Sequence, residues 1–275
     1  MPELPEVETI RRDLEKTILR KIFLKVEVFD PFVLRTPTEK FIQSLERKSI
    51  KTVDRRGKAL IFQLTKDRSL KDPLGYLVVQ LMMTGQLIVE AKPDKHTRIV
   101  FNFTDGSRLL YNDQRRFGQV RFVEQLSQVN HFNILGPEPL EKDFNPEYIL
   151  ERTKLRQRPI KSLLLDHTFV AGIGNIYACE ILFRSRIDPR RFASSLSPKE
   201  TQGIYKKTLE VLQEAIEYRG SSMRNYRDAL GEKGEFKKRI CVYAREEEKC
   251  FSCKSSVKRI MQAGRSTFFC PQCQK

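Results

Sequence analysis

The stretch Leu135-Gly136-Pro137-Glu138-Pro139 divides the sequence into two halves of different character. A glycine and two prolines within five residues interrupt any regular element. Before this stretch, short runs rich in β-branched residues are separated by turn signals such as Asp105-Gly106 and Phe117-Gly118. After it, longer segments carry apolar residues at helical spacing. The change predicts an α+β chain, with a β-sandwich in the first half and helices in the second.

The first half opens with one expected helix, residues 6–19, in which Val7, Ile10, Leu14 and Ile18 share a face. Eight strand-like runs follow, and their spacing is typical of a sandwich or barrel. They cover residues 22–28, 50–53, 59–64, 76–81, 86–89, 98–103, 108–111 and 119–123.

The second half predicts four helices, then a polar loop and a cysteine-bearing tail with strand character. The helices cover residues 147–154, 159–166, 175–184 and 198–218, and the loop covers 220–234. A chain of 275 residues suits two compact domains better than one. We expect an N-terminal helix and β-sandwich domain (1–134), a linker (135–145), a helical domain with a long loop (146–236) and a separate cysteine-bearing tail (237–275).

Charge narrows the class of partner. Lys and Arg total 51 against 35 for Asp and Glu, a formal net charge of +16, which favours a polyanion such as nucleic acid. No apolar run approaches the roughly 18 residues that span a bilayer. The acidic, proline-containing start is unlike a secretory signal. We therefore expect a cytoplasmic protein.

The tail contains the pattern Cys250-Phe-Ser-Cys253, sixteen residues, then Cys270-Pro-Gln-Cys273. Two Cys-x-x-Cys turns at this spacing predict a tetrahedral four-thiolate zinc site with no open position, and hence a structural ion. A catalytic metal and redox dithiols are the alternatives. The sixteen residues suffice for a β-hairpin, and the basic residues Lys258, Arg259 and Arg265 suit contact with nucleic acid.

The chain begins Met1-Pro2-Glu3-Leu4-Pro5. Removal of Met1 would leave Pro2 with a free secondary amine, which can attack a sugar carbon and form a positively charged iminium. Glu3 can supply a proton. Alternatively, the prolines stiffen an exposed start, and the following acids sit at the positive end of a helix.

Two turns between strands carry candidate DNA contacts. Lys58 follows a glycine at the entry to a strand, where a solvated lysine is the usual outcome. Arg115 and Phe117, in Asp113-Gln-Arg-Arg-Phe-Gly118, can read a base edge and wedge a stack apart. The alternative is a salt-bridged turn with Phe117 in the core. Met83 is likewise either a wedge or a core filler.

The sequence Gly172-Ile-Gly-Asn175 lies between two predicted helices. Free backbone N–H groups at the start of the second helix can bind phosphate. A plain glycine turn is the alternative.

Taken together, these motifs resemble those of the formamidopyrimidine-DNA glycosylases, bacterial enzymes that excise oxidised purines from DNA. The resemblance covers the whole chain in order. Its motifs are Pro2-Glu-Leu-Pro-Glu-Val-Glu-Thr9, Gly57-Lys58, Met83-Thr-Gly85, Asn112-Asp-Gln-Arg-Arg-Phe-Gly118, Leu135-Gly-Pro-Glu-Pro-Leu140, Gly172-Ile-Gly-Asn-Ile-Tyr-Ala178, Gly264-Arg-Ser-Thr267 and the four cysteines. It implies a helix-two-turn-helix region beside the zinc hairpin, with double-stranded DNA in the cleft between the domains and a monomeric enzyme.

The resemblance also implies roles. Pro2 attacks C1′ of the flipped nucleotide, Glu3 is the acid, Lys58 assists β-elimination, and Arg265 grips phosphate and assists δ-elimination. Met83, Arg115 and Phe117 fill the space left by the extruded base. The residues expected at the DNA backbone are His96, Arg156, Asn175 and Tyr243. The segment 221–236 corresponds to the loop that covers the flipped base.

Three positions depart from the family pattern. Gln80 stands where histidine is common, Lys254 stands where glycine is usual, and His167 replaces Gln or Asn. Two other functions are compatible with parts of the sequence. The endonuclease VIII type, which removes oxidised pyrimidines, usually starts Pro-Glu-Gly-Pro, whereas this chain has Leu4. A binding-only DNA protein is disfavoured by intact Pro2, Glu3 and Lys58.

Overall fold

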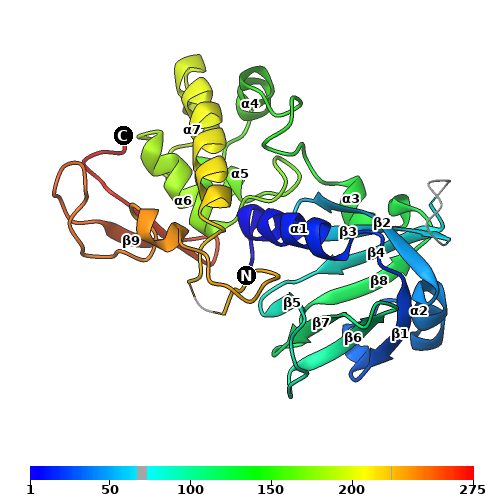
Figure 1. Cartoon of the computed structure of the whole chain (residues 1–275). Coiled ribbons are helices and arrows are strands. Elements are labelled where there is room, and N and C mark those ends of the chain that lie inside the picture. The colour runs from blue at the N-terminus through cyan, green and yellow to red at the C-terminus, as the bar shows by residue number, and fades with distance from the viewer. Residues whose placement is uncertain (67–72, 224) are drawn as a thin grey trace. The chain divides into compact units, whose positions relative to one another are not determined.

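The computed structural model describes residues 1–66, 73–223 and 225–275. They form two compact units (Figure 1). The first contains Met1–Asn133 and Tyr218–Glu235, and the second contains Ile134–Glu217 and Phe236–Lys275. The sequence division assigned residues 218–235 to the helical region, whereas the structure groups them with the first unit, because they bind the N-terminal helix. Residue 224 of the expected covering loop lies outside the described residues.

The first unit is a sandwich of two four-stranded antiparallel sheets, in the orders β1-β6-β7-β5 and β2-β3-β4-β8. Its strands are β1 (Phe23–Val28), β2 (Lys48–Arg56), β3 (Ala59–Lys66), β4 (Gly75–Gln80), β5 (Gly85–Val89), β6 (Thr97–Phe103), β7 (Arg108–Asp113) and β8 (Gln119–Val123). All eight predicted strands are confirmed. Its helical elements are α1 (Leu4–Ile18), η1 (Pro31–Val33), α2 (Thr38–Leu45), η2 (Leu126–Gln128) and α3 (Asn130–Asn133), of which only α1 was predicted.

Apolar periodicity explains how α1 is held. Val7, Ile10, Leu14 and Ile18 are each at most 1% exposed and belong to the core that fills the sandwich. Burial of side chains of this size contributes about 1.5–3 kcal/mol each. Helix α1 lies against β2 and β3 (Figure 1), so its N-terminus has a fixed place relative to the turn that joins those strands.

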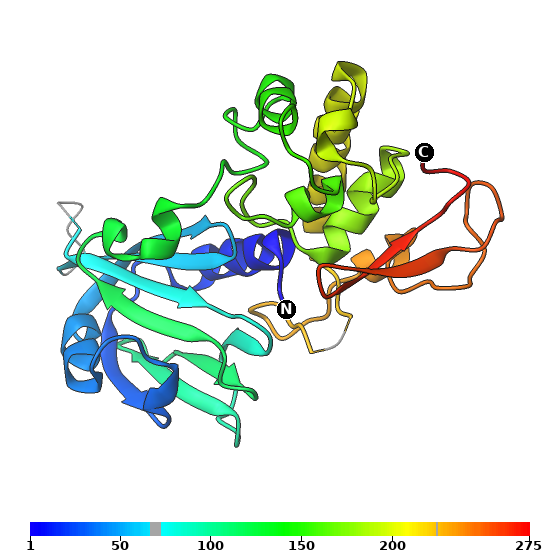
Figure 2. The same cartoon turned by 180° about the vertical axis from the view of Figure 1, so that it is seen from behind.

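The second unit is mainly helical. It contains α4 (Pro146–Thr153), α5 (Ile160–Leu164), α6 (Asn175–Arg184), η3 (Ala193–Ser195), α7 (Pro198–Glu217) and η4 (Phe236–Arg239). The four predicted helices are confirmed. Strands β9 (Lys258–Gln262) and β10 (Arg265–Phe269) pair as the hairpin expected between the cysteine pairs, drawn in orange and red in Figure 2.

None of the helices within the described residues has the length and apolar character needed to cross a bilayer.

Candidate functional site

Pro2 and Glu3 lie at the start of α1, and both are buried. Glu3 is the N-cap, and a capping box joins it to Glu6: the Glu3 carboxylate accepts from the Glu6 backbone, and the Glu3 N–H donates to Glu6 Oε2 at 2.8 Å. Such reciprocal bonds satisfy two N–H groups that a helix start leaves without partners. The Pro2-Glu3 pair is therefore attached to the first turn of a buried helix rather than to a loose end.

The second oxygen of Glu6 binds the segment 218–235. Oε1 accepts from the Ser221 N–H at 2.7 Å and from its hydroxyl at 3.2 Å. The hydroxyl of Tyr226 donates to the Glu6 carbonyl at 3.3 Å. Gly220 adopts φ +79°, and a Cβ there would lie 2.8 Å from the Glu6 side chain, so glycine suits this close approach. One buried carboxylate thus links the Glu3 backbone to the expected covering loop.

Arg219 fixes the same segment a second time. Its Nη2 lies 2.6 Å from Asp13 of α1 and 2.5 Å from Asp228, which is fully buried. Burial raises the pKa of Asp13 above its ordinary value, with the Asp228 charge adding to the rise, and the Arg219 bond only partly opposes it. The arginine holds two carboxylates that would otherwise repel each other.

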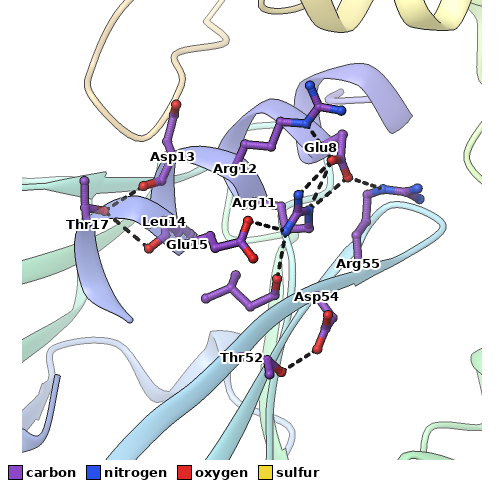
Figure 3. A network of polar contacts seen from close by, with 11 residues as sticks. Glu8, Arg11, Arg12, Asp13, Leu14, Glu15, Thr17, Thr52, Asp54 and Arg55 are labelled. Carbon is purple, nitrogen blue, oxygen red and sulfur yellow. Dashed lines mark hydrogen bonds and ion pairs between the residues drawn. The ribbon is translucent and has the colours of Figure 1, made fainter. Parts of the chain in front are cut away.

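Lys58 occupies a two-residue turn between β2 and β3, after Gly57 at φ +58°. Arg55 supports this turn by donating from Nη1 to the Gly57 carbonyl at 2.9 Å and from Nε to Glu8 at 3.2 Å. Glu8 lies in the second turn of α1, so its bond with Arg55 connects the lysine turn to the helix that carries Pro2 (Figure 3).

Three guanidinium groups converge on Glu8, as Figure 3 shows. Arg11 Nη2 is 3.1 Å from it and Arg12 Nε 2.9 Å, in addition to Arg55. Burial acts to raise the pKa of Glu8, but the bonds and charges of the arginines outweigh it, and the pKa lies below its ordinary value. Glu8 is therefore ionised at neutral pH.

Met83 and Phe117 are on the surface. Met83, in the β4–β5 turn, is 39% exposed, and Phe117, in the β7–β8 turn, is 48% exposed. The alternative interpretation of both as core residues is wrong. The Arg115 guanidinium lies 4.6 Å from the Phe117 ring centre, so these two side chains are stacked. His96 lies just before β6, and its carbonyl accepts from the Asp113 N–H at 2.9 Å.

In the second unit, Asn175 begins α6 and joins it to the zinc hairpin. Its Oδ1 accepts from Lys161 at 2.6 Å, and its Nδ2 donates to the Ser266 carbonyl at 2.8 Å. Lys161 is fully buried and also donates to Thr267 Oγ1 at 2.8 Å. Arg265, exposed at the start of β10, is therefore adjacent to a strand position fixed from α5 and α6.

Tyr243 is placed by Glu180 of α6. This fully buried carboxylate accepts from three consecutive backbone N–H groups, those of Cys241, Val242 and Tyr243, at 2.8, 3.0 and 2.9 Å. Burial raises the pKa of Glu180 in spite of these bonds. The Tyr243 ring meets Phe268 of β10 edge-on at 5.2 Å. Arg156, by contrast, is exposed between α4 and α5.

The four cysteines come together as predicted. Their sulfur atoms all lie within 4.8 Å of one another, with Cys250–Cys273 at 3.8 Å and Cys253–Cys270 at 3.4 Å. Sulfurs bound tetrahedrally to zinc lie about 3.8 Å apart, given a Zn–S distance near 2.3 Å. The donor set and its spacing fit one structural zinc ion.

Comparison with known families agrees with this geometry over most of the chain. Residues 1–120 match the formamidopyrimidine-DNA glycosylase N-terminal domain, and residues 135–227 match the H2TH domain of the same glycosylases. Residues 247–275 match a zinc finger found in FPG and IleRS. The chain belongs to the formamidopyrimidine-DNA glycosylase family.

Full-length relatives support the assignment. The chain is 40% identical to the formamidopyrimidine-DNA glycosylase of Pelotomaculum thermopropionicum over 282 residues, covering 100% of this chain and 99% of the relative. It is also similar to Lactococcus lactis Fpg in complex with abasic-site DNA (TM-score 0.90, 35% identity, 99% of each chain). A complex of wild-type Lactococcus lactis Fpg with N7-benzyl-Fapy-dG DNA gives TM-score 0.90 and 35% identity over 100% of each chain.

The family departures fall at places that keep their local geometry. Lys254 adopts φ +65° and its N–H donates to the Cys250 carbonyl at 3.0 Å, so the zinc knuckle keeps a left-handed residue where the family usually has glycine. The His167 carbonyl accepts from the Gly136 N–H at 2.8 Å, a bond that any side chain permits. Gln80 ends β4, paired with Gln119.

Sequence reasoning missed the buried residues that hold the glycosylase motifs in place. They are Glu6, Glu8, Asp113, Lys161, Glu180 and Ser221. Only Glu6 had a signal in the sequence, because it lies three residues after the N-cap, where a capping box places its acid.

Proposed function

We propose that this protein is a base-excision DNA glycosylase and abasic-site lyase that removes oxidised purines, 8-oxoguanine and formamidopyrimidines, from double-stranded DNA. The observation that carries the proposal is the pairing of Pro2 and Glu3 at a buried helix start with a lysine turn braced to that helix through Glu8 and Arg55. Membership of the family and the DNA complexes of the Lactococcus lactis enzyme support the substrate class. We propose a monomer acting on the chromosome in the bacterial cytosol.

The chemistry begins at the Pro2 nitrogen, which is nucleophilic only after Met1 is removed. The nitrogen lone pair forms a bond to C1′, and the base leaves with the electron pair of its glycosidic bond and takes up a proton, while the Pro2 nitrogen loses its own proton. Glu3 donates the proton that sugar-ring opening requires, which gives the iminium between Pro2 and C1′. Abstraction of a C2′ proton then expels the 3′ phosphate, with Lys58 assisting. A second elimination, assisted by Arg265, expels the 5′ phosphate.

Extrusion of the nucleotide costs a few kcal/mol in stacking and pairing. We propose that Met83, Arg115 and Phe117 fill the vacated space, with Arg115 facing the orphaned cytosine. Their exposure and the Arg115–Phe117 stack support this role. The expected contacts of His96, Arg156, Asn175 and Tyr243 with the DNA backbone, and the covering role of residues 221–236, belong to the same proposal.

Borohydride trapping tests the nucleophile. The protein from which Met1 has been removed is incubated with a duplex that contains 8-oxoguanine opposite cytosine. We expect it to form a covalent adduct with the DNA on reduction. Chain that retains Met1 is the matched control and is expected to form none, because its Pro2 nitrogen is an amide. Absence of an adduct in the processed chain, or equal trapping by Pro2→Gly, would overturn the assignment.

A further inference from the structure

Asp113, the last residue of β7, is a fully buried carboxylate surrounded by the segments that carry Met83, Arg115 and Phe117. Its Oδ1 accepts from the Thr84 hydroxyl at 2.5 Å and from the Arg115 N–H at 3.3 Å. Its Oδ2 accepts from the Gly118 N–H at 2.8 Å and from the Tyr111 hydroxyl at 3.4 Å. Thr84 is adjacent to Met83, and Gly118 is adjacent to Phe117.

Thr84 connects the two turns directly. The same hydroxyl that donates to Asp113 accepts from the Arg115 N–H at 2.9 Å. The hydroxyl thus donates one hydrogen bond to Asp113 and accepts another from the Arg115 N–H with one of its two lone pairs. The β4–β5 turn and the β7–β8 turn are joined through one side chain, while β5 and β7 pair between them with Gly85 opposite Asp113.

The β7–β8 turn leaves little freedom around these bonds. A Cβ at Gly118 would lie 1.7 Å from the Tyr111 hydroxyl, so only glycine fits there. Arg116 adopts φ +59°, and its side chain reaches Asp30 at 3.4 Å and the Phe32 ring at 5.4 Å. Arg115 and Phe117 instead stack on each other. The turn is held on one side by Asp113 and on another by Asp30.

We propose that Asp113 and Thr84 are positioning residues that lock the Met83 turn to the Arg115–Phe117 turn, so that the three side chains enter the base stack as one preformed element. The proposal deepens the proposed function and rests on it. A preformed element loses little conformational freedom on insertion, whereas two independent turns must each be ordered on the DNA.

Thr84→Val tests the link with little change of shape, because it removes the hydroxyl and keeps the branched side chain. In single-turnover assays we expect it to slow base release from duplex 8-oxoguanine opposite cytosine by about tenfold, since both hydroxyl bonds are lost. Strand cleavage at an abasic site in a single-stranded oligonucleotide, which has no paired stack to fill, should change by less than about twofold. Thr84→Ser keeps the hydroxyl and is expected to restore the duplex rate.

The fluorescence of 2-aminopurine placed beside the lesion gives a second measurement, because it reports unstacking before any bond breaks. A slower fluorescence rise in Thr84→Val, restored in Thr84→Ser, supports the proposal. Equal slowing on duplex and single strand, a duplex rate equal to wild type, or a Thr84→Ser variant as slow as Thr84→Val would overturn it. If the wild-type chain itself neither releases base nor forms an adduct, the proposed function fails as a whole.

Discussion

Replacement of Glu8 by Gln removes the negative charge on which Arg11, Arg12 and Arg55 converge (Figure 3). Glutamine keeps the shape and one acceptor oxygen, so the test isolates charge from packing. We expect the first unit to lose stability and the Lys58 turn to be held less firmly to α1, since the bond between Arg55 and residue 8 would no longer be charge-assisted on the acceptor side.

The size of this loss in stability depends on how deeply each arginine partner of Glu8 is buried. Arg55 is 9% exposed and Glu8 12%, so the loss of their charge-assisted bond is expected to cost about 1.5–3 kcal/mol. The pair with Arg12, which is 53% exposed, is screened by solvent and adds about 0.2–1 kcal/mol. The helical pair with Arg11 adds about 0.3–0.5 kcal/mol. The three contributions together predict a loss of about 2–4.5 kcal/mol in the free energy of unfolding.

The pH dependence has a definite sign. The arginines hold the pKa of Glu8 below its ordinary value in the folded chain, in spite of burial. Its contribution is therefore fully present above the unfolded pKa, near 4.5, and is lost as the pH falls through the lower folded pKa. The stability difference between wild type and Glu8→Gln should be full at pH 7 and should shrink below about pH 4.5.

The assay is urea-induced unfolding of the intact chain, with hydrogen exchange of peptides from α1 and β2 to report the first unit. Glu15→Gln is the matched control: it lies on the same helix and also pairs with Arg11, but it is 49% exposed and should cost less than about 0.5 kcal/mol. A Glu8→Gln loss no larger than that of the control would refute the reasoning. A loss that persists unchanged at pH 3 would show that charge is not its cause.

Three further predictions concern the second unit and the DNA. Glu180→Gln should destabilise the second unit by about 2–4 kcal/mol and weaken DNA binding, because one of the three backbone N–H groups would then face an amide donor. Thermal melting measures the stability, and a titration with DNA measures the affinity. Zinc removal by a chelator should abolish binding to undamaged duplex, and added zinc should restore it; unchanged affinity in Cys250→Ser would contradict the role of the hairpin. Binding to undamaged duplex should weaken steeply as the salt concentration rises. Arg265→Gln should reduce the slope of log K against log salt by about one. An affinity that does not change with salt would exclude the phosphate contacts.

The elements that the sequence predicts well are those with strong periodicity. Helix α1, the eight strands of the sandwich and the four helices of the second unit were all predicted within a few residues, because each has an apolar face of regular period. Helix α2 was missed. It is eight residues long, and only Phe41 and Leu45 are buried, a single i, i+4 pair that does not establish a period.

The sequence alone could not predict that residues 218–235 group with the first unit. The segment follows α7 directly and contains no strong apolar pattern. Its placement depends on single polar contacts with distant residues, such as Ser221 with Glu6 and Arg219 with Asp13. Hydrogen bonds between residues more than 200 positions apart leave no periodic trace in one sequence.

In the candidate site, the residues proposed to act on DNA could be predicted from the sequence, whereas the buried residues that position them could not. Residues proposed to act on DNA stand in recognisable motifs, because glycines and spaced cysteines mark their turns. The carboxylates that place them are harder to recognise. Glu6, Glu8 and Asp113 lie within the same motifs and Glu180 lies outside them, but apart from the capping-box position of Glu6 nothing in the sequence distinguishes their supporting role from that of the other acidic residues, 35 in all. In a chain of net charge +16, such acids are surrounded by arginines and backbone N–H groups, which are the partners a buried carboxylate requires. The basic composition that favours DNA therefore also allows buried acids to fix the geometry of the site, and loss of one such acid should weaken the site without removing any residue that touches DNA.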